Sequence, residues 1–167
     1  MTAEQIKLED KLSREITGFL QLQSIAAFKG DKKKKITYAD FLADKMLIIL
    51  AIRAGIPYSL FDLIQHYTPF TESDWAGFLD ISGKSLQRYR QAGSHSFKPL
   101  HSEKIIEMAE VTKAGLDVFG DMEKLKLWLN TPNFALGKLK PIELLKDSYG
   151  KELVMGELTR INYGILA

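Results

Sequence analysis

Apolar residues recur along this chain at steps of three and four, and this spacing is the feature that most restricts its fold. Near the N-terminus the pattern marks one helical face, which contains Leu8, Leu12, Ile16, Phe19, Leu22 and Ala26. No segment of the 167 residues shows sustained alternation of apolar and polar residues, and β-branched residues are sparse. The sequence therefore predicts an all-α protein.

Three of the expected helices begin with the same local signature, a hydroxyl residue followed three positions later by aspartate. The hydroxyl residues are Thr37, Ser59 and Thr71. Each hydroxyl can accept a hydrogen bond from an exposed backbone N–H, and an aspartate is favourable in the positive first turn. Asp121 is a further expected cap, and Pro141 fits the first turn of another helix. The expected helices with assigned bounds span about 38–54, 59–66, 72–79, 83–91, 102–119, 122–130 and 151–163.

The composition allows a real core and excludes several kinds of site. Apolar residues make up 46% of the chain, and the net charge is only +2. The absence of cysteine excludes disulfides, thiolate metal sites and cysteine nucleophiles. The charged N-terminal stretch lacks an apolar signal core, and the apolar run from Met46 to Ile52 is too short to span a bilayer. We therefore expect a soluble, cytoplasmic protein.

No set of residues suited to catalysis is recognisable. His66, His95 and His101 are scattered and form no metal-ligand pair. The chain has no Gly-x-Ser-x-Gly elbow and no glycine-rich phosphate loop. The run from Lys32 to Lys35 is interpreted as a solvated loop or, alternatively, as a phosphate contact. We expect no enzyme activity, no metal, no cofactor and no small-molecule substrate.

The stretch from Thr71 to Gly93 has the form of a helix-turn-helix, with a tight turn at Asp80-Ile81-Ser82. Asp80 occupies the position where such turns usually carry glycine, and aspartate tolerates a left-handed backbone better than most residues. Ala76 is small enough for a helix crossing, while Leu79, Ile81 and Leu86 are expected to pack between the helices and Tyr89 is expected in the core.

The second helix of this pair has two interpretations. It could enter a major groove, with its polar side chains at base edges and phosphates, or it could simply present a solvated polar face. From Ser82 to Lys98 there are basic residues and no acid. On the first interpretation a symmetric dimer is expected, and the predicted DNA-binding residues are Lys84, Ser85, Gln87, Arg88 and Arg90.

The C-terminal stretch predicts a small helical lobe in which proline turns interrupt apolar helices. Its expected core consists of Trp128, Leu144, Leu145, Val154 and Ile161. An arginine such as Arg160 near a helix end can cap carbonyl groups or contact a partner.

The order of residues in this lobe resembles that of the Xre/MbcA/ParS antitoxins, which pair with RES-domain toxins. The matching string is Trp128-Leu129, Pro132-Asn133, Ala135-Leu136-Gly137, Pro141 to Leu145, Gly150, Val154, Leu158, Arg160-Ile161 and Gly164. Upstream, Arg53 to Pro57, Leu79 to Ser82 and Phe119-Gly120-Asp121 also follow the family arrangement, so the resemblance covers about 50–167. The chain departs from the family at Ser85 (usually threonine), Lys138 (usually glycine) and Glu143 (often aspartate).

The resemblance implies an antitoxin with a divided structure. It implies a helix-turn-helix domain over 50–120 and a toxin-binding domain over 121–167. The N-terminal helical region over residues 1–49 lies outside the resemblance and could serve dimerisation or simply the core. The partner would be a RES-domain toxin that consumes NAD or transfers ADP-ribose, and the antitoxin would cover the toxin's active site and could repress its own operon. The toxin-binding residues so implied are Trp128, Pro132, Asn133, Leu136, Gly137, Pro141, Gly150, Arg160, Tyr163, Gly164, Ile165, Leu166 and Ala167. The alternative is a helix-turn-helix regulator without a toxin partner.

Overall fold

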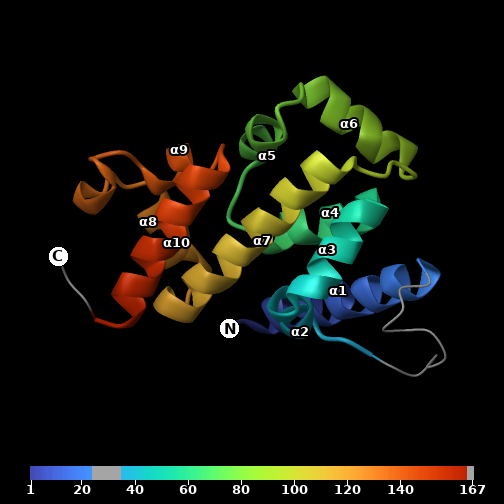
Figure 1. The fold of residues 1–167 in the computed structure, drawn as a ribbon, viewed down its shortest axis with the longest axis horizontal. Helices are drawn as coiled ribbons and strands as arrows, with labels where there is room; N and C mark the ends of the chain where they lie inside the picture. Colours follow the sequence, from blue (N-terminus) through green and yellow to red (C-terminus); the bar gives the residue numbers. More distant parts are fainter. Residues whose placement is uncertain (24–34, 165–167) are drawn as a thin grey trace. The chain divides into compact units, whose positions relative to one another are not determined.

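The computed structural model describes residues 1–23 and 35–164, and every regular element in these ranges is a helix (Figure 1). Within the described residues the only β pairing consists of two isolated bridges, Pro57 with Ser96 and Asn133 with Leu139, so the all-α prediction is confirmed. The helices are α1 (Ala3–Leu22), α2 (Tyr38–Ala43), α3 (Lys45–Ala54), α4 (Tyr58–Tyr67), α5 (Glu72–Leu79), α6 (Gly83–Ala92), α7 (Pro99–Phe119), α8 (Met122–Leu129), η2 (Phe134–Leu136), α9 (Pro141–Leu144) and α10 (Ser148–Asn162).

The end of the first predicted helix and most of the lysine run cannot be compared with the structure. Ala26 and the residues from Phe28 to Lys34 lie outside the described residues.

Several of the predicted caps are confirmed, and one is wrong. The hydroxyl of Thr37 accepts from the N–H of Asp40, Thr71 forms a complete capping box with Asp74, and Asp121 caps α8. Ser59 does not cap α4, because the helix begins one residue earlier at Tyr58. The carbonyl of Pro57 instead accepts the first helical hydrogen bonds. The hydroxyl of Ser59 is therefore available to donate to Glu15 on α1.

The helix predicted over 38–54 is two helices in the structure. Asp44 has an extended backbone (φ −103°, ψ 96°) between α2 and α3. Its carboxylate accepts from the N–H groups of Met46 and Leu47 at 3.0 and 3.1 Å, so it caps a new helix. Aspartate favours this capping geometry over a helix interior because its side chain competes for backbone N–H groups. The apolar period runs through both helices and does not reveal the break.

The structure divides into two compact units that are not continuous in sequence. The first unit comprises Met1–Tyr67 with Lys84–Ile106, and the second comprises Thr68–Gly83 with Glu107–Ala167. Helix α7 contributes residues to both. These units cross the sequence ranges 1–49, 50–120 and 121–167, which remain a prediction about domain organisation.

The first unit packs α1 against α4 and α2 (Figure 1). Phe97 is buried among aromatic rings, with ring centroids 5.0 Å from Phe61 and 6.4 Å from Tyr58. The fully buried hydroxyl of Ser102 accepts from the N–H of Ile56 and donates to the carbonyl of Phe97. These bonds satisfy buried backbone groups, which would otherwise destabilise the unit.

In the second unit, Phe70, Trp75 and Phe78 meet edge to face around α5. Farther along, α8 packs against α7 where Gly115 leaves room for it, because a Cβ at Gly115 would lie 2.3 Å from a methyl carbon of Leu125. Lys151 of α10 pairs with Glu110 of α7 at 3.3 Å, and both side chains are largely buried. The core that follows is formed by Leu125, Leu129, Leu136, Leu145, Val154 and Leu158.

Candidate functional site

The C-terminal lobe, residues 121–164, is shaped by a tight turn after η2. The side chain of Asn133 accepts from the N–H of Ala135, and its backbone N–H donates to the carbonyl of Leu139. Gly137 and Lys138 follow with left-handed backbones, at φ 69° and 65°. Lysine rarely adopts this conformation, whereas glycine adopts it readily. The departure from the family pattern at Lys138 therefore falls on a strained position.

Pro141 and Gly150 place the last two helices close together. Pro141 is buried at the first position of α9, where its missing N–H is not needed. Gly150 is also buried, in the first turn of α10, and a Cβ there would lie 1.7 Å from the carbonyl oxygen of Leu144. Only glycine permits this approach. Both residues were predicted as toxin-binding, and the structure places them in the framework of the lobe.

Helix α10 has two apolar faces. Gly150, Val154 and Leu158 are buried in the lobe. Tyr149 and Leu153 lie outside it, with 83% and 57% of their surface exposed. A helix that is apolar on a second, exposed face is typical of a surface that binds a partner.

A groove of about 760 Å³ runs between η2 and this exposed face of α10, two elements that are in contact. Phe134, which is 83% exposed, belongs to η2. The groove is lined by Ala135, Leu136, Tyr149, Glu152, Leu153, Gly156, Glu157 and Arg160. We call it the α10 groove. Its lining is mostly apolar, so its desolvation by a protein partner is favourable.

The charges of the α10 groove are unevenly paired. Arg160 and Glu157 form an ion pair at 3.3 Å, and the side chain of Glu157 is only 13% exposed. Glu152 is exposed, and among the described residues its carboxylate has no hydrogen-bond or ion-pair partner. The groove therefore presents one carboxylate without a counterion.

The remaining predicted toxin-binding residues differ in accessibility. Leu136 and Arg160 line the α10 groove, while Pro132 and Tyr163 are exposed outside its lining. Trp128, expected in the core, is half-buried with its ring 5.7 Å from that of Phe119. Gly164 ends the described chain with φ 68°. Ile165, Leu166 and Ala167 lie outside the described residues.

Sequence reasoning missed Phe134, Tyr149, Leu153, Gly156 and Glu157. A signal for three of them is present, because Tyr149, Leu153 and Gly156 recur at steps of four and three beside the core series on α10. Of the expected core residues, Leu145 and Val154 are buried, whereas Leu144 and Ile161 are half-buried.

The helix pair α5 and α6 has the predicted turn. Asp80 adopts the left-handed conformation (φ 52°, ψ 47°), as expected for the position that is usually glycine. The N–H of Ile81 donates to the carbonyl of Ala76, which closes α5. Leu79 and Leu86 are buried, while Ile81 is half-buried.

The predicted DNA-binding residues all lie on α6, and most are accessible. Lys84, Gln87 and Arg88 are exposed, and Ser85 is half-buried. The guanidinium of Arg90 donates to the hydroxyl of Tyr58, so part of its hydrogen-bonding capacity is used within the protein. Helix α6 contains no acidic residue, and its exposed cations suit contact with a polyanion.

The end of α6 is held by a stacked pair of rings. The rings of Tyr89 and His95 are parallel, with centroids 3.5 Å apart. Tyr89 is therefore half-buried against His95 rather than part of the deep core. Burial, His101 and Arg88 together lower the pKa of His95 below its ordinary value, in that order of importance.

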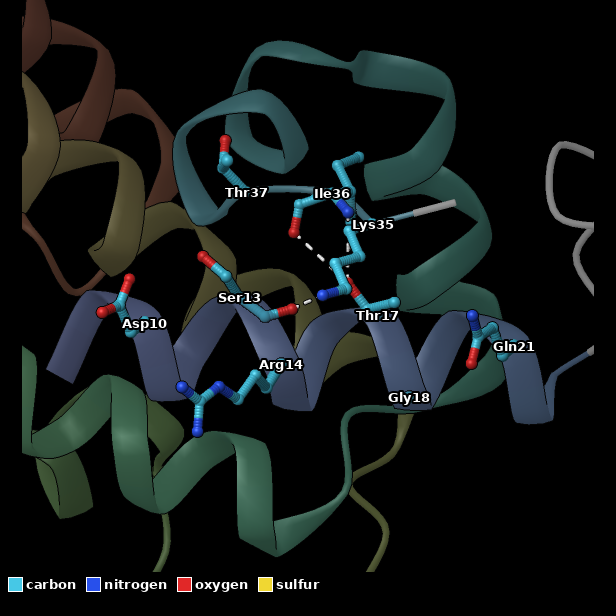
Figure 2. Close-up of a pocket in the computed structure, with 9 residues that line it drawn as sticks. All are labelled: Asp10, Ser13, Arg14, Thr17, Gly18, Gln21, Lys35, Ile36 and Thr37. Atoms are coloured by element: carbon cyan, nitrogen blue, oxygen red, sulfur yellow. Dashed lines mark hydrogen bonds between the residues drawn. The ribbon is translucent and has the colours of Figure 1, made fainter. Parts of the chain in front are cut away.

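The first unit contains a smaller groove, of about 450 Å³, between α1 and residues 35–37. Figure 2 shows Thr17 among the residues that line this groove, and its hydroxyl hydrogen-bonds with the backbone of Ser13 and of Ile36. We assign it no ligand.

Among the residues that the structure describes, no group of three or more His, Asp or Glu side chains could hold a metal ion. No helix in this part of the chain is long and apolar enough to cross a bilayer.

Comparison with known proteins gave two family matches that lie end to end. Residues 48–110 match the antitoxin Xre-like helix-turn-helix domain. Residues 114–164 match the antitoxin Xre/MbcA/ParS C-terminal toxin-binding domain. The α10 groove and its exposed apolar rim lie within the second match.

Two individual proteins are also similar to this chain. The antitoxin Xre of Yersinia enterocolitica is 27% identical over 122 residues, which span 72% of this chain and 82% of that protein. The crystal structure of the M. tuberculosis MbcT-MbcA toxin-antitoxin complex contains a chain with a TM-score of 0.52 and 22% identity, covering 64% of this chain and 94% of that one. The latter likeness concerns the fold. With both family domains in their usual order, the chain belongs to the Xre/MbcA/ParS-type antitoxins.

Proposed function

We propose that this chain binds and neutralises a cognate RES-domain toxin in the cytoplasm, covering the active site with which the toxin consumes NAD or transfers ADP-ribose. The observation that carries the proposal is the apolar rim of the α10 groove, which lies in the segment matched by the toxin-binding family. Large apolar side chains at 57–83% exposure are costly in a free protein and are favourable in an interface.

The proposal divides the predicted contact residues into two groups. Asn133, Gly137, Pro141 and Gly150 are proposed to act indirectly, since they shape the turn and the approach of α9 to α10. Direct contact is proposed for accessible residues, including those that sequence reasoning missed. These are Pro132, Phe134, Tyr149, Leu153, Arg160 and Tyr163. Leu136 is buried, and contact is proposed only for the part of it that lines the α10 groove. Trp128 is proposed to support the lobe, and Gly164 to Ala167 to lie near the toxin.

The test is inhibition of a RES-domain toxin by the purified full-length chain. NAD consumption by the toxin is followed while the chain is added from below to above equimolar concentration. The proposal predicts loss of NAD consumption at a fixed stoichiometry, together with a complex that survives size-exclusion chromatography. Unchanged NAD consumption with no complex would contradict it and would favour the regulator without a toxin partner.

A second candidate function, repression of the chain's own operon, is supported by the exposed cations of α6. We propose that a homodimer places two copies of α6 on duplex DNA. If Lys84, Arg88, Arg90 and Lys98 each neutralise one phosphate per subunit, the logarithm of affinity should fall with the logarithm of salt with a slope of about −3.6 per subunit.

The DNA-binding proposal is tested by titrating duplex promoter DNA at several salt concentrations. Gln87→Ala and Arg88→Ala are expected to weaken specific binding by about 1–3 kcal/mol each if they contact bases. Lys113→Ala, at a half-buried cation on α7 that pairs with Asp117, is a control outside α6. Equal loss in all three variants, or no binding by the wild type at low salt, would contradict a role for α6 in base recognition.

A further inference from the structure

We infer that the α10 groove receives an apolar side chain of the toxin that is flanked by a basic side chain, and that this basic group pairs with Glu152. The inference deepens the proposed function and rests on it. It specifies which surface of the lobe is occupied and the chemistry of the toxin segment that occupies it. Family membership alone specifies neither.

The apolar part of the inference follows from the lining of the groove. Leu136 lies on the η2 side, and Leu153 and Tyr149 lie on the α10 side. Gly156, also on α10, contributes no side chain, and a Cβ at this position would meet nothing within 4 Å. The groove is therefore open at Gly156, and apolar side chains from both η2 and α10 contribute to its lining. An aliphatic or aromatic side chain of a partner would desolvate this surface, whereas a polar one would lose its hydrogen bonds there.

The unpaired carboxylate of the groove determines which charged group of the partner is favourable beside its apolar side chain. The guanidinium of Arg160 is already paired with Glu157, whose carboxylate is mostly buried. Glu152 is exposed without a counterion among the described residues. A partner carboxylate placed beside the groove would therefore be repelled by Glu152, while a lysine or arginine would be attracted. Such complementarity affects specificity and association rate more than it affects total affinity.

The spacing of residues on α10 relates the position of the apolar lining to that of the unpaired carboxylate. Glu152 directly precedes Leu153, and Gly156 and Arg160 follow on the same side of the helix at steps of three and four. The unpaired carboxylate therefore lies between Tyr149 and Leu153, toward the N-terminal part of the α10 lining, and the Arg160–Glu157 pair lies toward its C-terminal end. A partner segment with its apolar anchor over Gly156 would place its basic group toward the Glu152 end.

The first test fills the groove without disturbing the core. Gly156→Leu adds a side chain into open space and replaces a residue that is unfavourable inside a helix, so folding should be retained. We expect it to weaken binding of the full-length chain to the RES-domain toxin at least tenfold. Gly18→Leu is the matched control, because a Cβ on Gly18 of α1 also meets nothing within 4 Å. Melting temperatures establish that both variants fold.

The second test reverses the free charge. Glu152→Lys is expected to weaken toxin binding at least fivefold at low salt, with a smaller effect at high salt. Glu123→Lys, at an exposed acid on α8, makes the same net charge change outside the groove and should have little effect. Tighter binding by Glu152→Lys would overturn the inferred basic neighbour.

The outcomes separate this inference from the proposed function. Wild-type inhibition of the toxin that is unchanged in Gly156→Leu and Glu152→Lys would overturn the inference and leave the antitoxin proposal standing. Failure of the wild type itself would overturn both. Light scattering on the free chain tests another occupant. If Gly156→Leu converts a dimer to a monomer, the groove holds a second copy of this chain, and the inference is wrong.

Discussion

Gly150 and Leu144 approach each other so closely that a Cβ on Gly150 would lie 1.7 Å from the carbonyl oxygen of Leu144. This approach holds α9 against α10, the helix that contributes most of the lining of the α10 groove. Gly150→Ala is expected to destabilise the lobe by about 1–3 kcal/mol or more, because a backbone segment has to move. Gly156→Ala on the same helix meets no atoms and should raise stability by up to about 1 kcal/mol. Denaturant unfolding measures both, and equal effects would contradict the close-approach argument.

Lys138 occupies a left-handed position where the family usually has glycine, and its ammonium lies 5.8 Å from the centroid of the Phe134 ring. Relief of a strain of roughly 1–2 kcal/mol should outweigh the added flexibility of glycine, which costs roughly 0.5–1 kcal/mol. Lys138→Gly is therefore expected to raise the unfolding free energy by up to about 1 kcal/mol. Lys140→Gly, at φ −74°, has no strain to relieve and should lower it. A loss of stability in both variants would show that the contact with Phe134 matters more than the backbone.

Two tyrosines in the first unit have opposite hydrogen-bonding states. The hydroxyl of Tyr38 is buried without a partner among the described residues, whereas the hydroxyl of Tyr67 donates to Glu9. Burial raises the pKa of Tyr38, so the hydroxyl stays protonated. Tyr38→Phe should leave the unfolding free energy unchanged or raise it by about 1 kcal/mol, since it removes an unsatisfied group. Tyr67→Phe should lower it by about 1.5–3 kcal/mol, because its partner is a carboxylate. Thermal melts at neutral pH compare the two.

The lowered pKa of His95 predicts that the folded protein loses stability as the pH falls. Its pKa in the folded protein is lowered below 6.5 by burial, His101 and Arg88. The unfolded chain therefore takes up a proton at higher pH than the folded protein does. The contribution of His95 is complete above about pH 6.5 and is lost as the pH falls from there toward the folded pKa. His95→Phe keeps a ring against Tyr89 but cannot titrate. The difference between wild type and variant should change between about pH 7 and pH 5, and a constant difference would contradict the assignment.

The sequence predicted the helical class because its signals are local. Apolar steps of three and four, the caps at Thr37, Thr71 and Asp121 and the left-handed Asp80 all depend on neighbouring residues. The predicted cap at Ser59 is wrong because α4 begins one residue earlier, at Tyr58, and the Ser59 hydroxyl donates instead to Glu15, which is distant in sequence. Asp44 was missed because an apolar stripe continues across the helix break that it caps.

The functional surface was harder to predict than the fold. The family string contains positions such as Pro141 and Gly150, and the structure shows that these are buried. The accessible residues Tyr149 and Leu153 belong to no motif. Their spacing indicates a second apolar face on α10, but this face is known to be exposed only once α10 is seen to bury the face that carries Val154 and Leu158. Which of the two apolar faces is covered depends on packing against other elements such as α9, and a single helix does not encode this.

The most direct measurement is NAD consumption by the RES-domain toxin proposed as the partner, in the presence of Leu153→Arg or Leu100→Arg. Both leucines are mostly exposed, at 57% and 76%, so neither change should unfold the chain. Leu153 lines the α10 groove, whereas Leu100 lies outside the toxin-binding match. The account predicts stoichiometric inhibition by wild type and by Leu100→Arg, with at least a tenfold higher concentration required for Leu153→Arg. Full inhibition by all three proteins would contradict the role of the groove, and inhibition by none would contradict the antitoxin function itself.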